Sequence, residues 1–203
     1  MARYASDHKE ATRRRILEAA AQRFKRDGVD GTGIAAVMAD AGLTNGAFYA
    51  HFDSKDDLVA HVVSDQVRQQ REHGGADLGS PDGLAAFIRD YLSRAHRDNA
   101  PVGCPSAAML QDVSRGSGAT RQAYGEELVV TIDEIAALVD APDPRTARSA
   151  AMSLFGSMVG ILQLARALPD ELADDLLEQG RRDILERASH LTARRGGKAP
   201  VDQ

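Results

Sequence analysis

Helical periodicity runs through nearly the whole chain, and this feature constrains the fold more than any other. Apolar residues recur at the three- and four-residue spacing of one helix face, as at Leu84, Phe87 and Ile88. We find no sustained two-residue alternation, which would indicate a strand, and no internal repeat. The sequence therefore predicts an all-α fold of about nine helices.

Capping residues, glycines and prolines mark the ends of the predicted helices. Ser54 and Asp57, for example, have the spacing of a capping box at the start of the fourth helix. The helices are expected over about 9–26, 34–41, 44–51 and 54–72, and then from residues 80, 104, 119, 143 and 169 onwards.

The composition is that of a globular chain, with 43% hydrophobic residues in a length of 203. The single cysteine, Cys104, excludes an internal disulfide and fits a reducing compartment, so we expect a cytoplasmic protein. No apolar run approaches the roughly 20 residues that span a bilayer, and no segment has the pattern of a signal peptide. We therefore expect no membrane partner.

The sequence contains no constellation of residues suited to catalysis or metal binding. Histidines such as His61, His73 and His96 are far apart and lack the spacing of metal ligands. The glycines of segment 28–33 are not followed by Gly-Lys-Ser/Thr, as a phosphate-binding loop requires. We expect no enzyme activity, no cofactor and no metal.

Charge is distributed unevenly along the chain. Residues 1–26 carry a net charge of +5, whereas the remainder carries −10. A protein with one basic end is suited to present that end to a polyanion such as DNA. The alternative is a solvated helix face with surplus arginine.

Two short predicted helices, 34–41 and 44–51, are joined by a tight turn at Gly42. This is the layout of a helix-turn-helix, whose second helix enters the major groove of DNA. Val37, Leu43, Phe48 and Phe52 supply the apolar contacts that hold the crossing. We therefore expect an N-terminal three-helix helix-turn-helix domain, followed by a larger C-terminal helical bundle.

The start of the second of these helices has polar and small residues suited to contact DNA. Thr44 and Asn45 can meet a phosphate or a base edge, and Gly46 lets the backbone approach closely. We expect base contacts from Asn45, Ala47 and Thr44, with Ala47 limited to a thymine methyl group.

The residues that follow are suited to hold the phosphate backbone. Tyr49, His51 and Lys55 can each donate a hydrogen bond to a phosphate. Alternatively, Tyr49 and His51 are a buried pair that braces the domain, and Lys55 is a solvated residue at a helix start.

Residues 32–58 resemble the DNA-binding domain of the tetracycline repressor (TetR) family, with the motif spacing matched without a gap. The motif residues are Thr32, Val37-Met38, Ala41-Gly42-Leu43-Thr44, Gly46, Tyr49-Ala50-His51-Phe52, Ser54-Lys55 and Leu58. The chain departs from the family pattern where Gly33 replaces a second Thr, and where Ala35 and Ala36 replace a polar pair. Helix 34–41 is therefore expected to make fewer phosphate contacts than it does in typical members.

The resemblance implies that Thr44, Asn45, Gly46, Tyr49, His51 and Lys55 lie at the DNA, and Thr32 and Ala47 complete the expected DNA-binding set. It also implies a C-terminal domain that dimerises and often binds a small ligand. We accordingly divide the chain into a DNA-binding domain at 1–54, a sensing and dimerisation domain at 55–193, and a flexible tail at 194–203.

The last two predicted helices are expected to pair two chains in a four-helix interface, with Gly156 and Gly160 allowing close approach. Its expected residues are Ala151, Leu154, Phe155, Met158, Leu162, Leu176 and Ile184. The alternative is that both helices pack only on their own subunit. A dimer reading two half-sites predicts a pseudo-palindromic operator.

A ligand pocket is expected in the helical domain, with ordinary core packing as the alternative for each lining residue. Its expected residues are Phe87, Tyr91, Cys104, Met109, Leu110, Tyr124, Leu128, Phe155 and Met158. Cys104 precedes a predicted helix start, where the helix dipole lowers a thiol pKa. It is therefore either a sensor of oxidants or electrophiles, or a small buried residue.

Together these expectations describe a DNA-binding transcriptional regulator, a repressor that a small-molecule inducer releases from double-stranded operator DNA. The inducer would act by shifting helix 54–72, which connects the pocket to the DNA-binding domain. One alternative is a repressor that senses redox state through Cys104, and another is a helical adaptor that does not bind DNA.

Overall fold

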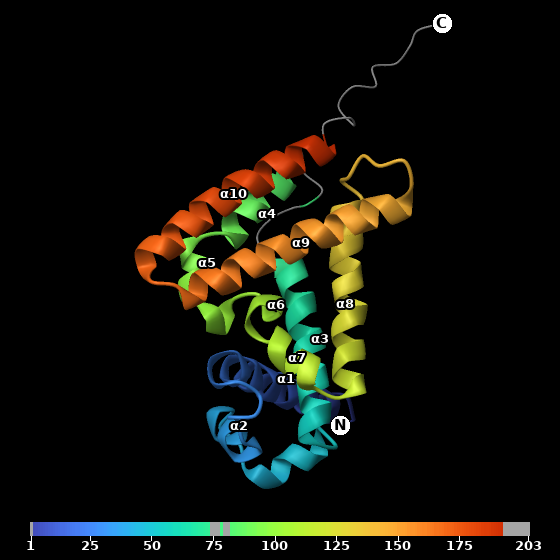
Figure 1. The fold of residues 1–203 in the computed structure, drawn as a ribbon. Helices are drawn as coiled ribbons and strands as arrows, with labels where there is room; N and C mark the ends of the chain where they lie inside the picture. The colour runs from blue at the N-terminus through green and yellow to red at the C-terminus, as the bar shows by residue number, and fades with distance from the viewer. Residues whose placement is uncertain (1, 74–77, 79–81, 193–203) are drawn as a thin grey trace, which may run out of the picture. The chain divides into compact units, whose positions relative to one another are not determined.

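The computed structural model describes residues 2–73, 78 and 82–192. Every regular element within them is helical, which confirms the predicted all-α class (Figure 1). The elements are α1 (Ala2–Asp27), α2 (Ile34–Asp40), the 3-10 helix η1 (Asn45–Ala50), α3 (Lys55–His73), α4 (Gly83–Tyr91), α5 (Arg94–Asp98), the 3-10 helix η2 (Ala100–Val102), α6 (Pro105–Ala108), α7 (Leu110–Arg115), α8 (Gly118–Ala136), α9 (Pro144–Ala167) and α10 (Asp170–Thr192).

The chain forms two compact units, each built from two separate segments. Unit 1 comprises Met1–Glu72 and Ala100–Glu127, and unit 2 comprises His73–Asn99 and Leu128–Gln203. The helix α8 begins in unit 1 and ends in unit 2. This division differs from the expected boundary at residue 54, because α3 belongs to the same unit as α1, α2 and η1.

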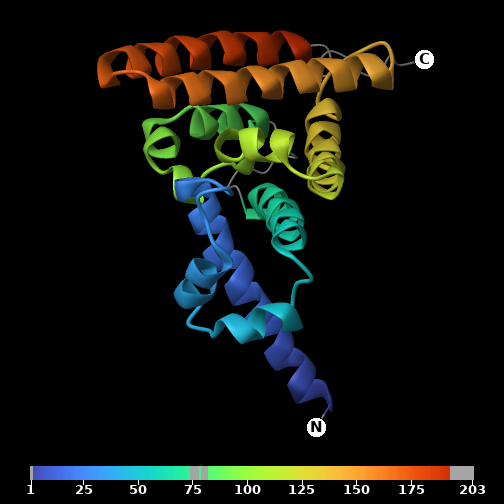
Figure 2. The ribbon, with the colours of Figure 1, turned by 60° about the horizontal axis from the view of Figure 1, so that its bottom comes forward.

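Unit 1 has one continuous core. The face of α1 that carries Ile16, Ala20 and Phe24 is buried against α2, η1 and α3, and Phe48 and Leu58 are no more than 1% exposed. In Figure 2, α2 lies to one side of α1 and η1 passes across it, and the N-terminal end of α1 continues past both. Burial of this apolar surface supplies the main free energy that holds the three-helix arrangement together.

The second segment of unit 1 joins the same core. Met109 and Val113, from α6–α7, are at most 4% exposed and pack with the first-segment residues. Two long-range hydrogen bonds accompany this packing: Val29 N donates to Asp112 Oδ1 over 3.1 Å, and Lys25 Nζ donates to Gly103 O over 2.9 Å. The segment that follows η2 is thus fixed directly to the C-terminal end of α1.

In unit 2, α9 and α10 form an antiparallel hairpin whose helices lie side by side (Figures 1 and 2). Gly180 makes this close approach possible, because a Cβ there would lie 2.9 Å from Ile161 Cδ1. Arg166 also donates hydrogen bonds to the carbonyl oxygens of His96 and Arg97, so that α5 is held against α9.

Several helix boundaries follow the predicted signals. Asp57 N donates to Ser54 Oγ over 3.1 Å, which confirms the cap at the start of α3. Thr146 N donates to Asp143 Oδ1 over 3.0 Å, and α9 begins at Pro144 as expected. The expected helix start at residue 80 and the tail at 194–203 lie outside the described residues.

Other elements differ from the prediction. The helix expected over 44–51 is a 3-10 helix, and the helix expected from residue 104 is divided into α6 and α7 at Met109. Met109 takes φ −120° and ψ 3°, outside the α-helical region, while its side chain is fully buried in the core of unit 1. Core packing therefore interrupts a segment whose local sequence favours one helix.

The helix α9 has the length and composition of a membrane-spanning segment, since residues 149–165 carry no charge. A core helix of a soluble protein has the same properties, and 39% of the apolar stretch is buried inside the chain. Its packing against α10 explains part of this apolar character.

Candidate nucleic-acid interface

The turn between α2 and η1 is built on Gly42. Its φ of +66° lies in the left-handed region, which side chains other than glycine rarely adopt. Leu43 N donates to Met38 O over 2.8 Å and closes the turn. Arg15 of α1 donates from Nη2 to Ala41 O over 2.5 Å, so α1 holds the turn in place.

Two aromatic residues fix the path of the chain from η1 into α3. Phe48 and Phe52 are at most 2% exposed, and their ring centroids lie 5.7 Å apart. Tyr49, between them, is 70% exposed and meets the Phe48 ring edge-on at 5.2 Å. Tyr49 therefore does not form the buried pair with His51 that the sequence left as an alternative. Its ring lies on the surface and contacts the buried ring of Phe48.

The expected DNA-binding residues of η1 lie at the surface. Thr44, Asn45, Gly46 and Tyr49 are exposed, and Ala47 is half-buried. Thr44 precedes η1 in an extended conformation, and its side chain makes no capping hydrogen bond. A Cβ added at Gly46 would meet nothing within 4 Å, so the backbone there is open to an approaching molecule.

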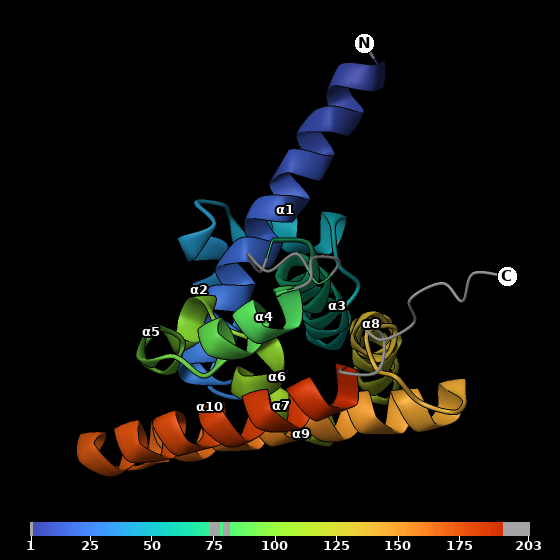
Figure 3. The same ribbon diagram turned by 90° about the horizontal axis from the view of Figure 1, so that it is seen from above.

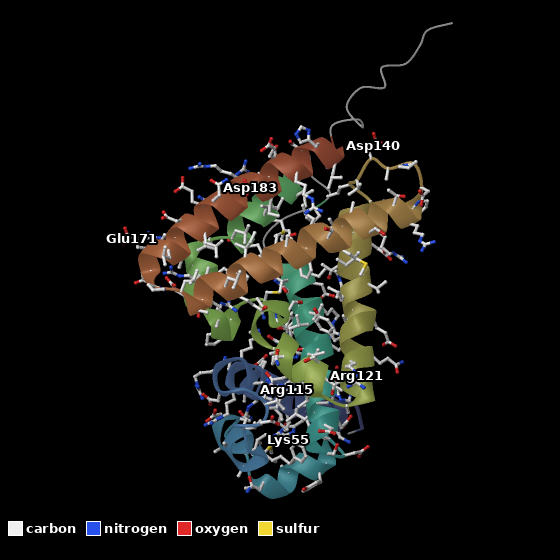
Figure 4. The ribbon with its side chains drawn as sticks, in the orientation of Figure 1. Lys55, Arg115, Arg121, Asp140, Glu171 and Asp183 are labelled. Atoms are coloured by element: carbon white, nitrogen blue, oxygen red, sulfur yellow. The ribbon has the colours of Figure 1, made fainter. Side chains whose placement is uncertain are left out.

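Lys55 is the first residue of α3 and is half-buried (Figure 4). No carboxylate of the described residues lies within ion-pair distance of its ammonium group. It is thus a positive charge close to the C-terminal end of η1 that no described carboxylate neutralises.

Thr32 has a different role from the one expected. Its side chain is 1% exposed, and its hydroxyl donates to Gly28 O over 2.8 Å. A hydroxyl that is buried and already engaged in closing the loop after α1 is not available to a phosphate. The prediction of a DNA contact by the Thr32 side chain is therefore corrected to a structural role.

His51 ends η1 in an unusual environment. Its Nδ1 atom is buried and has no hydrogen-bond partner among the described residues. Burial lowers the pKa of His51, and the positive charges of Lys9 and Arg13 lower this pKa further. The fold thus favours the neutral form of the imidazole, and two cations from the first half of α1 act on it electrostatically.

The cations of α1 fall into two groups that the sequence alone does not distinguish. In the last part of the helix, Arg23 forms a two-bond ion pair with Asp40 at 2.5 and 3.0 Å, and Arg26 pairs with Asp27 at 2.8 Å. The hydrogen bonds from Arg23 lower the pKa of Asp40. These charges are neutralised within unit 1.

The first part of α1 has cations without such partners. Among the described side chains, no carboxylate lies within 4 Å of the nitrogen atoms of Lys9, Arg13 or Arg14. The Arg13 guanidinium lies over the Phe52 ring at 4.9 Å from its centroid. The sequence signal for these residues was the basic excess of segment 1–26, but it could not separate paired from unpaired charges.

The expected pocket residues are divided between the two units. Cys104, Met109, Leu110 and Tyr124 belong to unit 1, while Phe87, Tyr91, Leu128, Phe155 and Met158 belong to unit 2. In unit 2, the ring of Tyr91 lies 5.6 Å from Phe87 and 5.9 Å from Phe155. In unit 1, Met109 is part of the core, and Tyr124 donates from its hydroxyl to Ser106 Oγ over 2.9 Å.

A surface hollow of about 380 Å³ lies along α10, and its lining includes Asp183, Arg187 and His190. None of the expected pocket residues lines it. Among the residues that the structure describes, no three His, Cys, Asp or Glu side chains are grouped to hold a metal.

The expected dimer residues lie within unit 2 rather than on its surface. Leu176 is half-buried, and the others are at most 6% exposed. The buried residues are Ala151, Leu154, Phe155, Met158, Leu162 and Ile184. A side chain buried in its own subunit has little surface to offer a second chain, so in the single chain these residues have the core packing that the sequence left as the alternative. Which residues pair two chains stays a prediction.

Comparison with known proteins agrees with this geometry. Residues 16–62 match the family of bacterial regulatory proteins, tetR family. A probable HTH-type transcriptional regulator, ArpR, from Pseudomonas putida is 31% identical over 111 residues, which are 55% of this chain and 45% of that protein. The chain thus matches less than half of the length of this relative.

Solved structures extend the likeness over most of the chain. A TetR transcriptional regulator from Chloroflexus aurantiacus J-10-FL superposes with a TM-score of 0.68 and 25% identity, covering 89% of this chain and 95% of the other. A transcriptional regulator FadR from Bacillus subtilis, in complex with stearoyl-CoA, has a TM-score of 0.66 and 16% identity, covering 86% and 96%. At 16% identity the second likeness establishes the fold alone.

Proposed function

Because residues 16–62 match the tetR family of bacterial regulatory proteins, we propose that the chain is a homodimeric repressor of this family, which a small-molecule ligand releases from a palindromic operator. The observation that carries the DNA-binding part is the surface of η1. Thr44, Asn45 and Tyr49 are exposed, while Phe48 and Phe52 of the same segment are buried in the core and hold it in place. A DNA-binding regulator of this kind acts in the cytoplasm.

Each part of this surface has its own task. Tyr49, His51 and Lys55 contact phosphates, which fix the orientation of η1 on the duplex without reading its sequence. Asn45, Ala47 and Thr44 face base edges in the major groove. Direct readout is modest, because only Asn45 among them has the amide that recognises adenine through two hydrogen bonds.

Selection of bound duplexes from a random pool, followed by titration of the selected duplex, tests this function. We expect a pseudo-palindromic site whose affinity falls steeply with salt. Asn45→Ala should relax base preference at one position in each half-site. Recovery of asymmetric single half-sites would argue against the palindrome, and absence of any preferred sequence would refute the regulator itself.

Dimerisation is proposed through the outer face of α9 together with α10. Met152 and Leu164 are 56% and 60% exposed in the single chain, and nothing lies within 4 Å of a Cβ added at Gly156 or Gly160. Leu172 of α10 is 55% exposed. An uncharged face with small residues at its centre allows two such hairpins to approach closely and form a four-helix interface.

We propose that the ligand shifts the DNA-binding elements α1, α2 and η1 between two states. This requires a connection between the sensing helices and α1. Unit 1 contains such connections. Lys25 bridges Gln66 Oε1 of α3 at 2.6 Å and Gly103 O at 2.9 Å, and Asp112 of α7 accepts from Val29 N. A ligand that moves η2, α6 or α7 would therefore change the position of α1 and α3.

The two alternative functions have less support. Cys104 is 1% exposed, and a buried thiol reacts slowly with oxidants and electrophiles unless the structure opens. An adaptor that does not bind DNA leaves unexplained why the Tyr49 side chain is 70% exposed. Full response of a Cys104→Ser variant to the inducer would eliminate the thiol as the sensor.

A further inference from the structure

We propose that the first half of α1 extends the DNA interface, with Lys9 and Arg13 binding backbone phosphates that flank the base pairs contacted by η1. The inference rests on the proposed function and adds to it. Both residues precede the segment that matches the family, which begins at residue 16. The ligand class is the phosphodiester backbone of double-stranded DNA.

The first support is the placement of the two side chains. Lys9 and Arg13 are four residues apart in α1 and therefore share one helix face. Arg13 lies over Phe52, which directly follows His51, and both cations act electrostatically on His51. This face of α1 is thus turned towards the end of η1, where the phosphate-binding groups lie.

The second support is the direction of α1. Its N-terminal end projects past η1, as two views of unit 1 show (Figures 2 and 3). Lys9 is exposed, and Arg13 lies one helical turn nearer to the core. The projecting part of the helix can therefore reach DNA beyond the few base pairs that one short 3-10 helix covers.

The third support is electrostatic. Among the described side chains, Lys9 and Arg13 have no carboxylate within 4 Å, although Arg23 and Arg26 of the same helix are both paired. The positive charges of Lys9 and Arg13 also repel each other, because the two residues lie four apart on one face of α1, and this costs free energy in the unbound protein. Negative phosphates at this place would remove the repulsion.

The proposed contacts also compensate for the lack of polar side chains at the start of α2. Gly33 and Ala35 are exposed at the start of this helix and offer no polar side chain, and Ala36 is only half-buried. If α2 binds few phosphates, other cations of unit 1 are needed to give the affinity for DNA that a regulator requires. Contacts from Lys9 and Arg13 add affinity without adding base preference.

The test compares the double variant Lys9→Gln/Arg13→Gln with a control variant that also loses two positive charges. Arg26→Gln/Arg148→Gln serves as the control, because Arg26 pairs with Asp27 and Arg148 pairs with Asp133. Fluorescence anisotropy with the selected duplex gives the dissociation constant at several KCl concentrations. Competition with base-substituted duplexes gives the base preference.

We expect the slope of log affinity against log salt to fall by about 0.9 for each phosphate that is no longer neutralised, or about 1.8 per protomer for the double variant. Affinity at moderate salt should fall roughly tenfold, while the order of preferred bases stays unchanged. The control should bind like the wild type. Lys9→Arg/Arg13→Lys, which keeps the charges, should retain most of the affinity.

A salt slope equal to that of the control would overturn the inference, and so would a changed order of base preference. Lys9→Gln alone guards against misfolding, because Lys9 has no described contact in the core; it should lower the slope by about 0.9 per protomer. If the wild type binds no duplex specifically, the proposed function fails instead. The two failures are therefore distinguishable.

Discussion

At the scale of single residues, burial separates the side chains that form the core of unit 1 from those that are proposed to contact DNA. Phe48 and Tyr49 are neighbours in the chain, yet their exposed fractions are 0% and 70%. The 3-10 geometry of η1 and the edge-on contact of their rings place one in the core and the other on the surface. Their substitutions should therefore have opposite consequences.

We expect Tyr49→Ala to weaken DNA binding while the free energy of unfolding changes by less than about 0.5 kcal/mol, as at other exposed positions. Phe48→Ala should destabilise the protein by about 3–5 kcal/mol, because it leaves a cavity in the core. Urea denaturation and DNA titration of both variants check this. Tyr49→Phe, which removes only the hydroxyl, tests whether the phosphate contact is a hydrogen bond.

His51 should make the stability of unit 1 depend on pH. Burial is the main cause of its lowered pKa, with Lys9 and Arg13 adding to it. In the unfolded chain the imidazole takes up a proton near its ordinary value of 6.5, before it does so in the folded state. The contribution of His51 is therefore full above this pH and is lost as the pH falls below it.

The measurement is urea denaturation between pH 7.5 and 5.5 for the wild type and His51→Asn. The stability of the variant should decline less over this interval, because it lacks the titrating group. Parallel declines would show that other groups cause the pH dependence.

At the scale of elements, glycine positions decide which helices can approach each other. The sequence pattern assigned close approach to Gly156 and Gly160, and the structure leaves the space beside both of them open. Within unit 2, Gly180 instead allows α10 to contact α9, because Ile161 occupies the place of its missing side chain. A wide apolar stripe in the sequence shows that a helix packs against another element. It does not show which glycine lies at the contact.

Gly180→Ala should destabilise the α9–α10 hairpin by about 1–2 kcal/mol, because overpacking against Ile161 costs more than alanine gains in helix propensity. Gly125→Ala in α8 is the matched control. Nothing lies within 4 Å of a Cβ at Gly125, so alanine there should raise stability by about 0.5–1 kcal/mol through helix propensity. Thermal denaturation of the two variants gives opposite signs if this account is correct.

At the scale of the whole molecule, the outer face of α9 should control assembly and hence DNA affinity. Met152→Glu/Leu164→Glu places two carboxylates on the proposed interface, where pairing would bury them without partners. We expect a shift from dimer to monomer in sedimentation velocity, together with a large loss of operator affinity. Val129→Glu, at a 48% exposed position of α8, is the control.

A Met152→Glu/Leu164→Glu protein that remains dimeric would move the interface away from this face. A monomer that keeps full operator affinity would separate DNA binding from dimerisation and contradict the palindromic site.

The sequence by itself determined the features that depend on local interactions. Helical periodicity, the Ser54–Asp57 cap, the glycine turn at residue 42 and the start of α9 at Pro144 all arise from contacts between residues close in the chain. The family motif over residues 32–58 is equally local, since it lies on consecutive elements of one small domain. For these features the sequence prediction and the structure agree.

Tertiary structure decided what depends on residues far apart in the chain. It buried Thr32, placed Met109 in the core of the first helices, and paired Arg23 with Asp40, while no described carboxylate pairs with Lys9 or Arg13. An apolar or charged residue has the same appearance in the sequence whether a distant segment covers it or not. Burial and ion pairing are properties of the packed chain, and they distinguish the core of this protein from the surface proposed to hold DNA.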